Sequence, residues 1–203
     1  MKRFAILLLV AMAGMAQAEE PALAKEVKAS LIFRAEPARS HPQARFVRVY
    51  LHLENLGPHA VQWVCDIGDI QAEFLDEAGH PFSGEKLGGV TGGSWMGRGP
   101  IAYSLPYHST MEWMIAEDRY DFTTSGAGLY IVGFGLIPHL YTPDELRHCF
   151  LKLRIYGVPH SSDTLAYGNA MVKRDGDVHT FPTLFDFPAT PIVLTDELIA
   201  PFP

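Results

Sequence analysis

The sequence predicts an all-β protein, with antiparallel strands packed as a β-sandwich, and three observations support this prediction. Apolar and polar residues alternate with a period of two in many short segments, which is typical of strands with one buried face. The chain holds 18 glycines and 15 prolines, which suit a protein with many turns. Beyond the first residues, no long segment has helical periodicity. A closed β-barrel is the alternative arrangement of such strands.

The first 18 residues have the layout of a secretory signal peptide. Lys2 and Arg3 precede an apolar stretch at 4–15, and Ala16-Gln17-Ala18 forms a cleavage site with two small residues. This apolar stretch is too short for a permanent anchor, and no second stretch of spanning length follows. We therefore expect a mature protein that starts at residue 19, is periplasmic or secreted, and has no transmembrane anchor.

Seven strands are expected before residue 157, and six of them are recognised by an alternating apolar face. In chain order the seven segments run over Val27 to Phe33, Val47 to Leu53, Val61 to Cys65, Ile70 to Phe74, Met111 to Ile115, Leu129 to Leu136 and Leu151 to Ile155. The segment 129–136 is apolar on both faces, which predicts a central strand. Asp76-Glu77-Ala78-Gly79 predicts a tight turn after the fourth strand.

Residues 19–157 are expected to form the sandwich core, and residues 158–203 a Phe- and Pro-rich extension on the same domain. The extension is too short to bury a core of its own. We expect it to contain a hairpin of 169–173 and 178–181 around Asp175-Gly176, followed by an extended segment anchored by phenyl rings. Short helical turns are expected at 142–145 and 195–198.

The chain contains two cysteines, Cys65 and Cys149, and strand parity places both on inward faces. In an oxidising compartment an even pair of cysteines favours a disulfide, which is therefore predicted between them. Two buried free thiols are the alternative.

Gly128-Leu129-Tyr130-Ile131-Val132 resembles the tyrosine-bearing start of a late strand in immunoglobulin-like sandwiches. The resemblance implies an immunoglobulin-like β-sandwich with long end loops, and it carries no function. Trp63 precedes the first cysteine instead of following it on the next strand, which excludes an antibody-type domain.

Charge and motifs exclude or weaken several functions. The net charge of −7 and the absence of a basic patch argue against nucleic-acid binding. The segment 92–96 lacks the second glycine of a nucleophile elbow, and Ser83-Gly84-Glu85-Lys86 lacks its companion motifs. The nine histidines form no His-x-His or His-x-x-x-His pair. No catalytic residue, metal ligand or cofactor is predicted. A periplasmic copper or zinc protein, and a hydrolase with a non-contiguous site, stay open as alternatives.

The glycine-rich loop 83–100 is the strongest candidate for function. It displays Trp95, Met96 and Arg98, and Tyr103 and Tyr107 follow closely. Aromatic residues and arginine dominate the energetics of protein contacts, and a loop of this length between strands is uncommon unless it has a use. We therefore expect a non-enzymatic protein that recognises a protein or cell-envelope ligand through end loops, in an inhibitor, immunity or assembly role.

Overall fold

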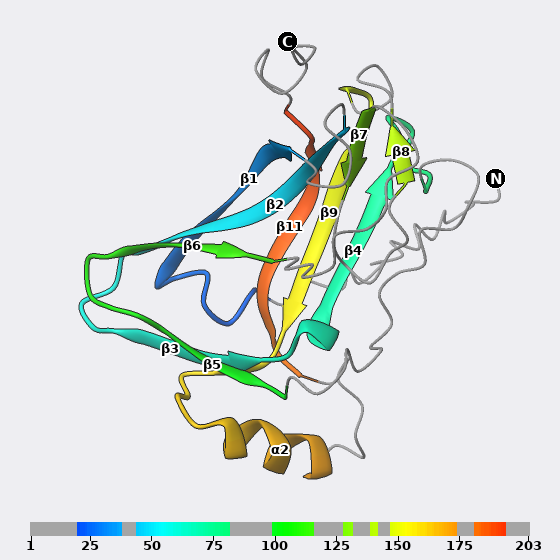
Figure 1. Ribbon diagram of the computed structural model, residues 1–203. Helices are drawn as coiled ribbons and strands as arrows, with labels where there is room; N and C mark the ends of the chain where they lie inside the picture. Colours follow the sequence, from blue (N-terminus) through cyan, green and yellow to red (C-terminus); the bar gives the residue numbers. More distant parts are fainter. Residues whose placement is uncertain are drawn as a thin grey trace, which may run out of the picture.

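The computed structural model describes residues 20–37, 44–81, 99–115, 128–131, 139–141, 147–173 and 181–193. This part of the chain folds into three small sheets and one α-helix (Figure 1). The first sheet contains β1 (Val27–Pro37), β2 (Ala44–Asn55), β6 (Thr110–Met114), β7 (Gly128–Ile131) and β8 (His139–Tyr141). The second contains β3 (Val61–Cys65), β5 (Ile101–Leu105) and β10 (Val158–Pro159). The third contains β4 (Ile70–Leu75), β9 (Phe150–Tyr156) and β11 (Thr183–Pro191).

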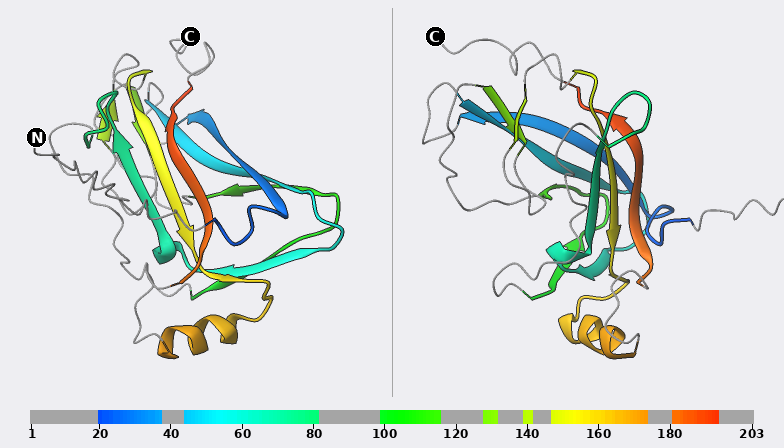
Figure 2. Two further views of the ribbon diagram at one scale, coloured as in Figure 1. Left: turned by 180° about the vertical axis from the view of Figure 1, so that it is seen from behind. Right: turned by 90° about the vertical axis from the view of Figure 1, so that its right-hand side faces the viewer.

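The β-sandwich is confirmed, because residues from all three sheets share one core and the sheets do not close into a barrel (Figure 2). Nearly all strand pairs are antiparallel. The exception is β7, which runs parallel to β2 and pairs Ala44 with Gly128. β7 lies between β2 and β8, so the expectation of an interior strand at the start of 129–136 is also confirmed.

The alternation of apolar residues produces the core as expected. Val47, Val49, Leu51 and Leu53 of β2 are fully buried, and the residues between them are only half-buried. β9 repeats the arrangement with buried Leu151, Leu153 and Ile155. The predicted turn after β4 is also present: Gly79 donates its N–H to the carbonyl oxygen of Asp76 at 3.0 Å and adopts φ +80°.

Two strand pairs form one long ribbon that bends from the first sheet into the second. β2 pairs with β6, and their continuations β3 and β5 pair with each other. The bend lies where β2 turns into β3 and β5 turns into β6, at the far left of Figure 1. The ribbon therefore carries two adjacent turns at one outer corner of the molecule.

The predicted disulfide is wrong for this structure. Cys65 and Cys149 are both buried in the core, as strand parity indicated, but both are free thiols. Cys65 lies beside Gly157, where an added Cβ would be 2.9 Å from the cysteine Cβ. Cys149 immediately precedes β9, at the other end of that strand. Eight residues of extended chain separate Cys149 from Gly157 and span roughly 26 Å. Cys65 lies beside Gly157, so it is too far from Cys149 for a disulfide, which needs Cα atoms within about 7 Å.

The C-terminal region also differs from the prediction. Residues 169–173, expected to form one arm of a hairpin, belong to the helix α2 (Thr164–Lys173). Asp163 begins this helix, because its carboxylate accepts the N–H of Leu165 at 2.8 Å. The extended segment is the strand β11, whose Phe185 and Phe187 anchor it in the core as expected. The helical turns expected at 142–145 and 195–198 lie outside the described residues.

Candidate functional site

The bend of the long ribbon is the candidate site, and we call it the Asn55 corner: residues 55–60, between β2 and β3, and residues 105–109, between β5 and β6. Asn55 ends the alternating pattern of β2, and its side chain is 1% exposed. Its Nδ2 lies within hydrogen-bond distance of the carbonyl oxygens of His59 (2.8 Å), Leu105 (3.1 Å) and Pro106 (3.0 Å), so its two hydrogens are shared among three acceptors. Its Oδ1 accepts the N–H of Gly57 at 2.9 Å. One buried side chain therefore ties both turns together.

Backbone hydrogen bonds add to this fixation. Asn55 N–H donates to the carbonyl oxygen of Ser109 at 3.0 Å, which joins the two turns a second time. Leu56 N–H donates to the carbonyl oxygen of Glu26 at 2.8 Å, so the segment before β1 also holds the corner. Because buried polar groups are costly when unpaired, these bonds favour one conformation of the corner over alternatives.

The second turn presents two aromatic rings. Ser109 N–H donates to the carbonyl oxygen of Pro106 at 3.2 Å and closes the turn around Tyr107 and His108. His108 adopts φ +51°, in the left-handed region that residues other than glycine rarely enter. This backbone places the two rings with their centroids 3.8 Å apart. Backbone strain of this kind costs about 1 kcal/mol. It is often found at functional sites, where a side chain is held in one position.

The corner is also apolar where it meets solvent. Leu56 and Tyr107 are each 54% exposed, and the neighbouring Pro58 and Pro106 are exposed as well. Large apolar side chains that stand in the open on a fixed backbone are suited to binding, because the backbone loses little conformational entropy on contact.

The predicted binding residues do not lie together in the structure. Tyr107 lies in the corner and is exposed, as a contact residue must be. Tyr103 is half-buried in β5, where its ring stacks on Trp63 at 5.5 Å and also contacts Trp113 at 4.6 Å. It therefore packs the inner face of the ribbon. The remaining three predicted residues, Trp95, Met96 and Arg98, lie outside the described residues.

A second cluster of polar groups lies beneath α2, but its geometry is that of a structural contact. Asp69, in the 3-10 turn Ile67–Asp69, is 1% exposed and accepts a hydrogen bond from the hydroxyl of Tyr167 at 2.8 Å. Its other carboxylate oxygen accepts the N–H of Asp66 at 2.7 Å. Burial raises the pKa of Asp69 to about 6, although these two hydrogen bonds oppose the shift. Tyr167 is the buried residue of α2, so this pair fixes the helix to the second sheet.

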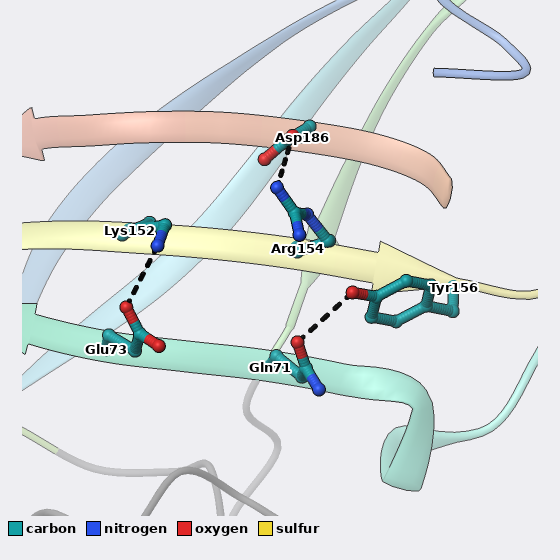
Figure 3. Close-up of polar contacts among 6 residues, drawn as sticks. All are labelled: Gln71, Glu73, Lys152, Arg154, Tyr156 and Asp186. Atoms are coloured by element: carbon teal, nitrogen blue, oxygen red, sulfur yellow. Dashed lines mark hydrogen bonds and ion pairs between the residues drawn. The ribbon is translucent and has the colours of Figure 1, made fainter. Parts of the chain in front are cut away.

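The outer face of the third sheet carries a ladder of paired polar groups (Figure 3). Lys152 contacts Glu73 at 3.1 Å, and Arg154 contacts Asp186 at 2.8 Å. The hydroxyl of Tyr156 donates to the amide oxygen of Gln71 at 3.2 Å. The hydrogen bond to Asp186 raises the pKa of the Arg154 guanidinium above its ordinary value. These cross-strand contacts stabilise the sheet, and each of the charged groups drawn lies beside one of opposite charge.

The two thiols have the chemistry of core residues. Burial raises the pKa of the Cys149 thiol to about 12 and raises that of Cys65 well above its ordinary value. A thiol that stays protonated is a poor nucleophile and a poor metal ligand. Within the described ranges no three residues among His, Cys, Asp and Glu lie close enough to hold a metal ion.

Sequence reasoning missed Asn55 and Leu56. Asparagine before Gly57 reads as an ordinary turn residue, and nothing local shows that it bonds to a turn fifty positions away. In the part of the chain that the structure describes, no helix is long and apolar enough to cross a membrane. Comparison of the chain with protein-family models, with curated proteins and with solved structures finds no match.

Proposed function

We propose that the mature protein acts in the periplasm or outside the cell as a non-enzymatic binding protein, and that the Asn55 corner recognises a protein or cell-envelope ligand. One observation carries the proposal: Leu56 and Tyr107, each more than half exposed, stand on two turns held together by one buried side chain. Trp95, Met96 and Arg98 remain predicted contributors to the same function.

Ordering a flexible surface when a partner binds costs free energy and so lowers affinity. Immobilising a side chain with many rotamers costs about 0.5–1.5 kcal/mol at an interface. Tyr107 has few rotamers, packs against His108, and sits on a turn that Asn55 already fixes. Most of its contact energy is therefore available for affinity, as in the aromatic anchors of known interfaces.

The location can be tested separately from the binding. Expression of the full chain in a Gram-negative host should give a periplasmic protein whose measured mass corresponds to a start at Glu19. Recovery of the uncleaved chain from the cytoplasm would contradict the proposed location and leave the corner to be judged by the following experiment.

Binding is best tested with a photoreactive phenylalanine analogue at position 107, in the native cells. We expect a discrete crosslinked adduct. Leu56→Ser, made in the same protein, should reduce the adduct several-fold, because it removes the apolar side chain of the adjoining turn. Val193→Ser is the matched control, since Val193 is also an exposed apolar residue but lies after β11.

Both substituted proteins must retain the melting temperature of the unchanged protein for the comparison to hold. Loss of the adduct with Leu56→Ser but not with Val193→Ser supports recognition by the corner. An adduct that is indifferent to Leu56→Ser, or the absence of any adduct at position 107, overturns the proposal.

A further inference from the structure

We infer that α2 is a lid on the second sheet, and that a proton on the carboxyl group of Asp69 favours its closed position. α2 lies outside the three sheets and contacts β3 and β10 of the second sheet (Figure 1 and Figure 2). Tyr167 is its buried residue, whereas Leu165 and Val172 are 72% and 80% exposed. The attachment of the helix to the sheet therefore depends largely on one tyrosine side chain.

The carboxyl group of Asp69 is enclosed in this attachment. Tyr167 packs in an apolar cluster with Val64, Tyr156 and Phe181, and the ring centroids of Tyr167 and Phe181 lie 4.9 Å apart. Asp69 is 1% exposed and accepts the hydroxyl of Tyr167 at 2.8 Å. Among the described residues, no cation contacts this carboxylate. A buried carboxylate without a cation is costly when it is ionised, so the closed lid favours its neutral form.

Three titratable groups face Asp69, and none of them supplies a positive charge. They are Asp66 before the 3-10 turn, Cys65 at the end of β3, and Tyr167 of α2. Burial raises the pKa of Cys65 and of Tyr167 above their ordinary values, so both stay protonated up to about pH 8. Burial also raises the pKa of Asp69 to about 6, although the hydrogen bonds from Asp66 N–H and the Tyr167 hydroxyl oppose the shift. Asp69 is therefore the group whose ionisation depends on the position of the lid.

The closed lid binds this proton more tightly than the open lid does. When the lid opens, the carboxyl group of Asp69 returns to water, where its pKa has the ordinary value of 3.8. Rising pH therefore favours the open lid, and the change is nearly complete once the pH has passed the closed-state pKa of about 6. From these two pKa values, the ratio of open to closed molecules should rise about 60-fold from pH 4 to pH 8.

The chain enters α2 through a short link whose hydrogen bonds are local. β10 is followed by His160, which adopts φ +56°, and then by two serines. Asp163 N–H donates to the hydroxyl of Ser161 at 3.1 Å, within the link itself. α2 has ten residues, and an isolated helix of this length is only marginally stable in water. A helix that leaves the sheet therefore also loses its own backbone hydrogen bonds, so amide exchange in α2 measures the opening of the lid.

The test is amide hydrogen exchange in the purified protein, followed by NMR at pH 4 and pH 8 and corrected for the intrinsic exchange rate at each pH. Protection of residues 168–171, in the middle of α2, should fall about 60-fold between these two conditions. The amides of β9 serve as the reference for unfolding of the whole chain. Low urea concentrations should speed exchange in β9 and leave exchange in α2 nearly unchanged, because opening the lid exposes far less surface than unfolding.

Two matched variants each replace one of the two neighbouring carboxyl groups. Asp69→Asn is a neutral isostere: its Oδ1 can accept the N–H of Asp66, and its Nδ2 can donate to the hydroxyl oxygen of Tyr167. Protection of α2 in this variant should change less than about threefold between pH 4 and pH 8. Asp66→Asn removes the adjacent carboxylate and leaves Asp69 in place, so the fall in protection should remain larger than about tenfold.

A fall in α2 protection that Asp69→Asn abolishes, that Asp66→Asn retains and that low urea does not alter supports the inference. Protection of α2 that does not change with pH in the natural sequence overturns it, and this measurement needs no variant. A fall that Asp69→Asn retains assigns the titration to another group and also overturns the inference. Equal urea dependence of α2 and β9 does the same, because the helix then opens only when the whole protein unfolds. None of these outcomes bears on the Asn55 corner, which is formed by other turns.

Discussion

Replacing Asn55 by alanine removes the side chain that holds the corner together. The two hydrogens of the amide nitrogen are shared among three carbonyl oxygens, those of His59, Leu105 and Pro106, and the amide oxygen accepts the N–H of Gly57. Alanine can replace none of these bonds. We therefore expect the folded protein to lose stability and the two turns to lose their fixed relation.

The magnitude follows from the surroundings of each bond. A neutral hydrogen bond contributes about 1 kcal/mol net, and a buried group left unpaired costs about 1–3 kcal/mol. The bond to Leu105 is buried, whereas the other three are part-buried, so water can replace them in part. The expected loss for Asn55→Ala is about 3 kcal/mol. For a chain of this length such a loss lowers Tm by about 6–12 °C.

Urea unfolding followed by tryptophan fluorescence measures this loss, because Trp63 and Trp113 lie in the same ribbon. Ser109→Ala is the control. It removes an exposed hydrogen bond to the carbonyl oxygen of Pro106 in the second turn, and should cost less than about 0.5 kcal/mol. A loss below about 1 kcal/mol for Asn55→Ala, or equal losses for both variants, would refute the reasoning.

Asn55→Asp sharpens the same test. The shapes are nearly equal, but a carboxylate oxygen would face carbonyl oxygens and could not donate to them. Burial would raise the pKa of the introduced carboxyl, so the destabilisation should grow as pH rises above its unfolded value of about 3.9. We expect a larger loss than for alanine at pH 7, and a smaller one below about pH 4. A loss that does not depend on pH would show that solvent reaches the site.

Three further predictions concern the core. The pKa of Asp69 is about 6 in the folded protein against an ordinary 3.8, so its contribution to stability is complete below about pH 4 and is lost as pH rises through 6. Over this pH window the free energy of unfolding should fall by about 3 kcal/mol in full. Asp69→Asn should not show this fall, so the urea midpoints of the two proteins should diverge. Gly157→Ala would place a Cβ against the carbonyl oxygen of Val64, and should reduce soluble yield and unfold at clearly lower urea concentration than the unchanged protein. Without reductant, Cys65 and Cys149 should resist alkylation in the native protein and should both react after denaturation. An intact protein mass two daltons short would instead reveal a disulfide.

The sequence pattern is clearest for strands such as β2 and β9, which have one face in the core. β2 and β9 bury every second residue completely, so their alternation is strong. β5 was missed because its residues are mostly exposed, and exposure removes the contrast on which the pattern depends. α2 was missed for a related reason: Tyr167 is its buried residue, whereas Leu165 and Val172 face solvent, so no apolar stripe marks it as a helix.

The candidate site could be anticipated only in part. Tyr107 was selected for its residue type and because it follows the glycine-rich loop closely, and it is exposed in the corner. Tyr103 was selected on the same grounds, but it packs against Trp63 in the ribbon. Residue type indicates what a side chain can do, and only its neighbours in space decide whether it is free to do it.

The sequence by itself determined the fold class and the inward direction of both thiols, because period-two alternation is a local property of each strand. The tertiary structure alone decided that Cys65 and Cys149 lie at opposite ends of β9, and that Asn55 bonds across to Leu105 and Pro106. Such contacts depend on how distant strands are paired and how the long ribbon bends. No local pattern encodes them, because they arise only when the sheets come together around their common core.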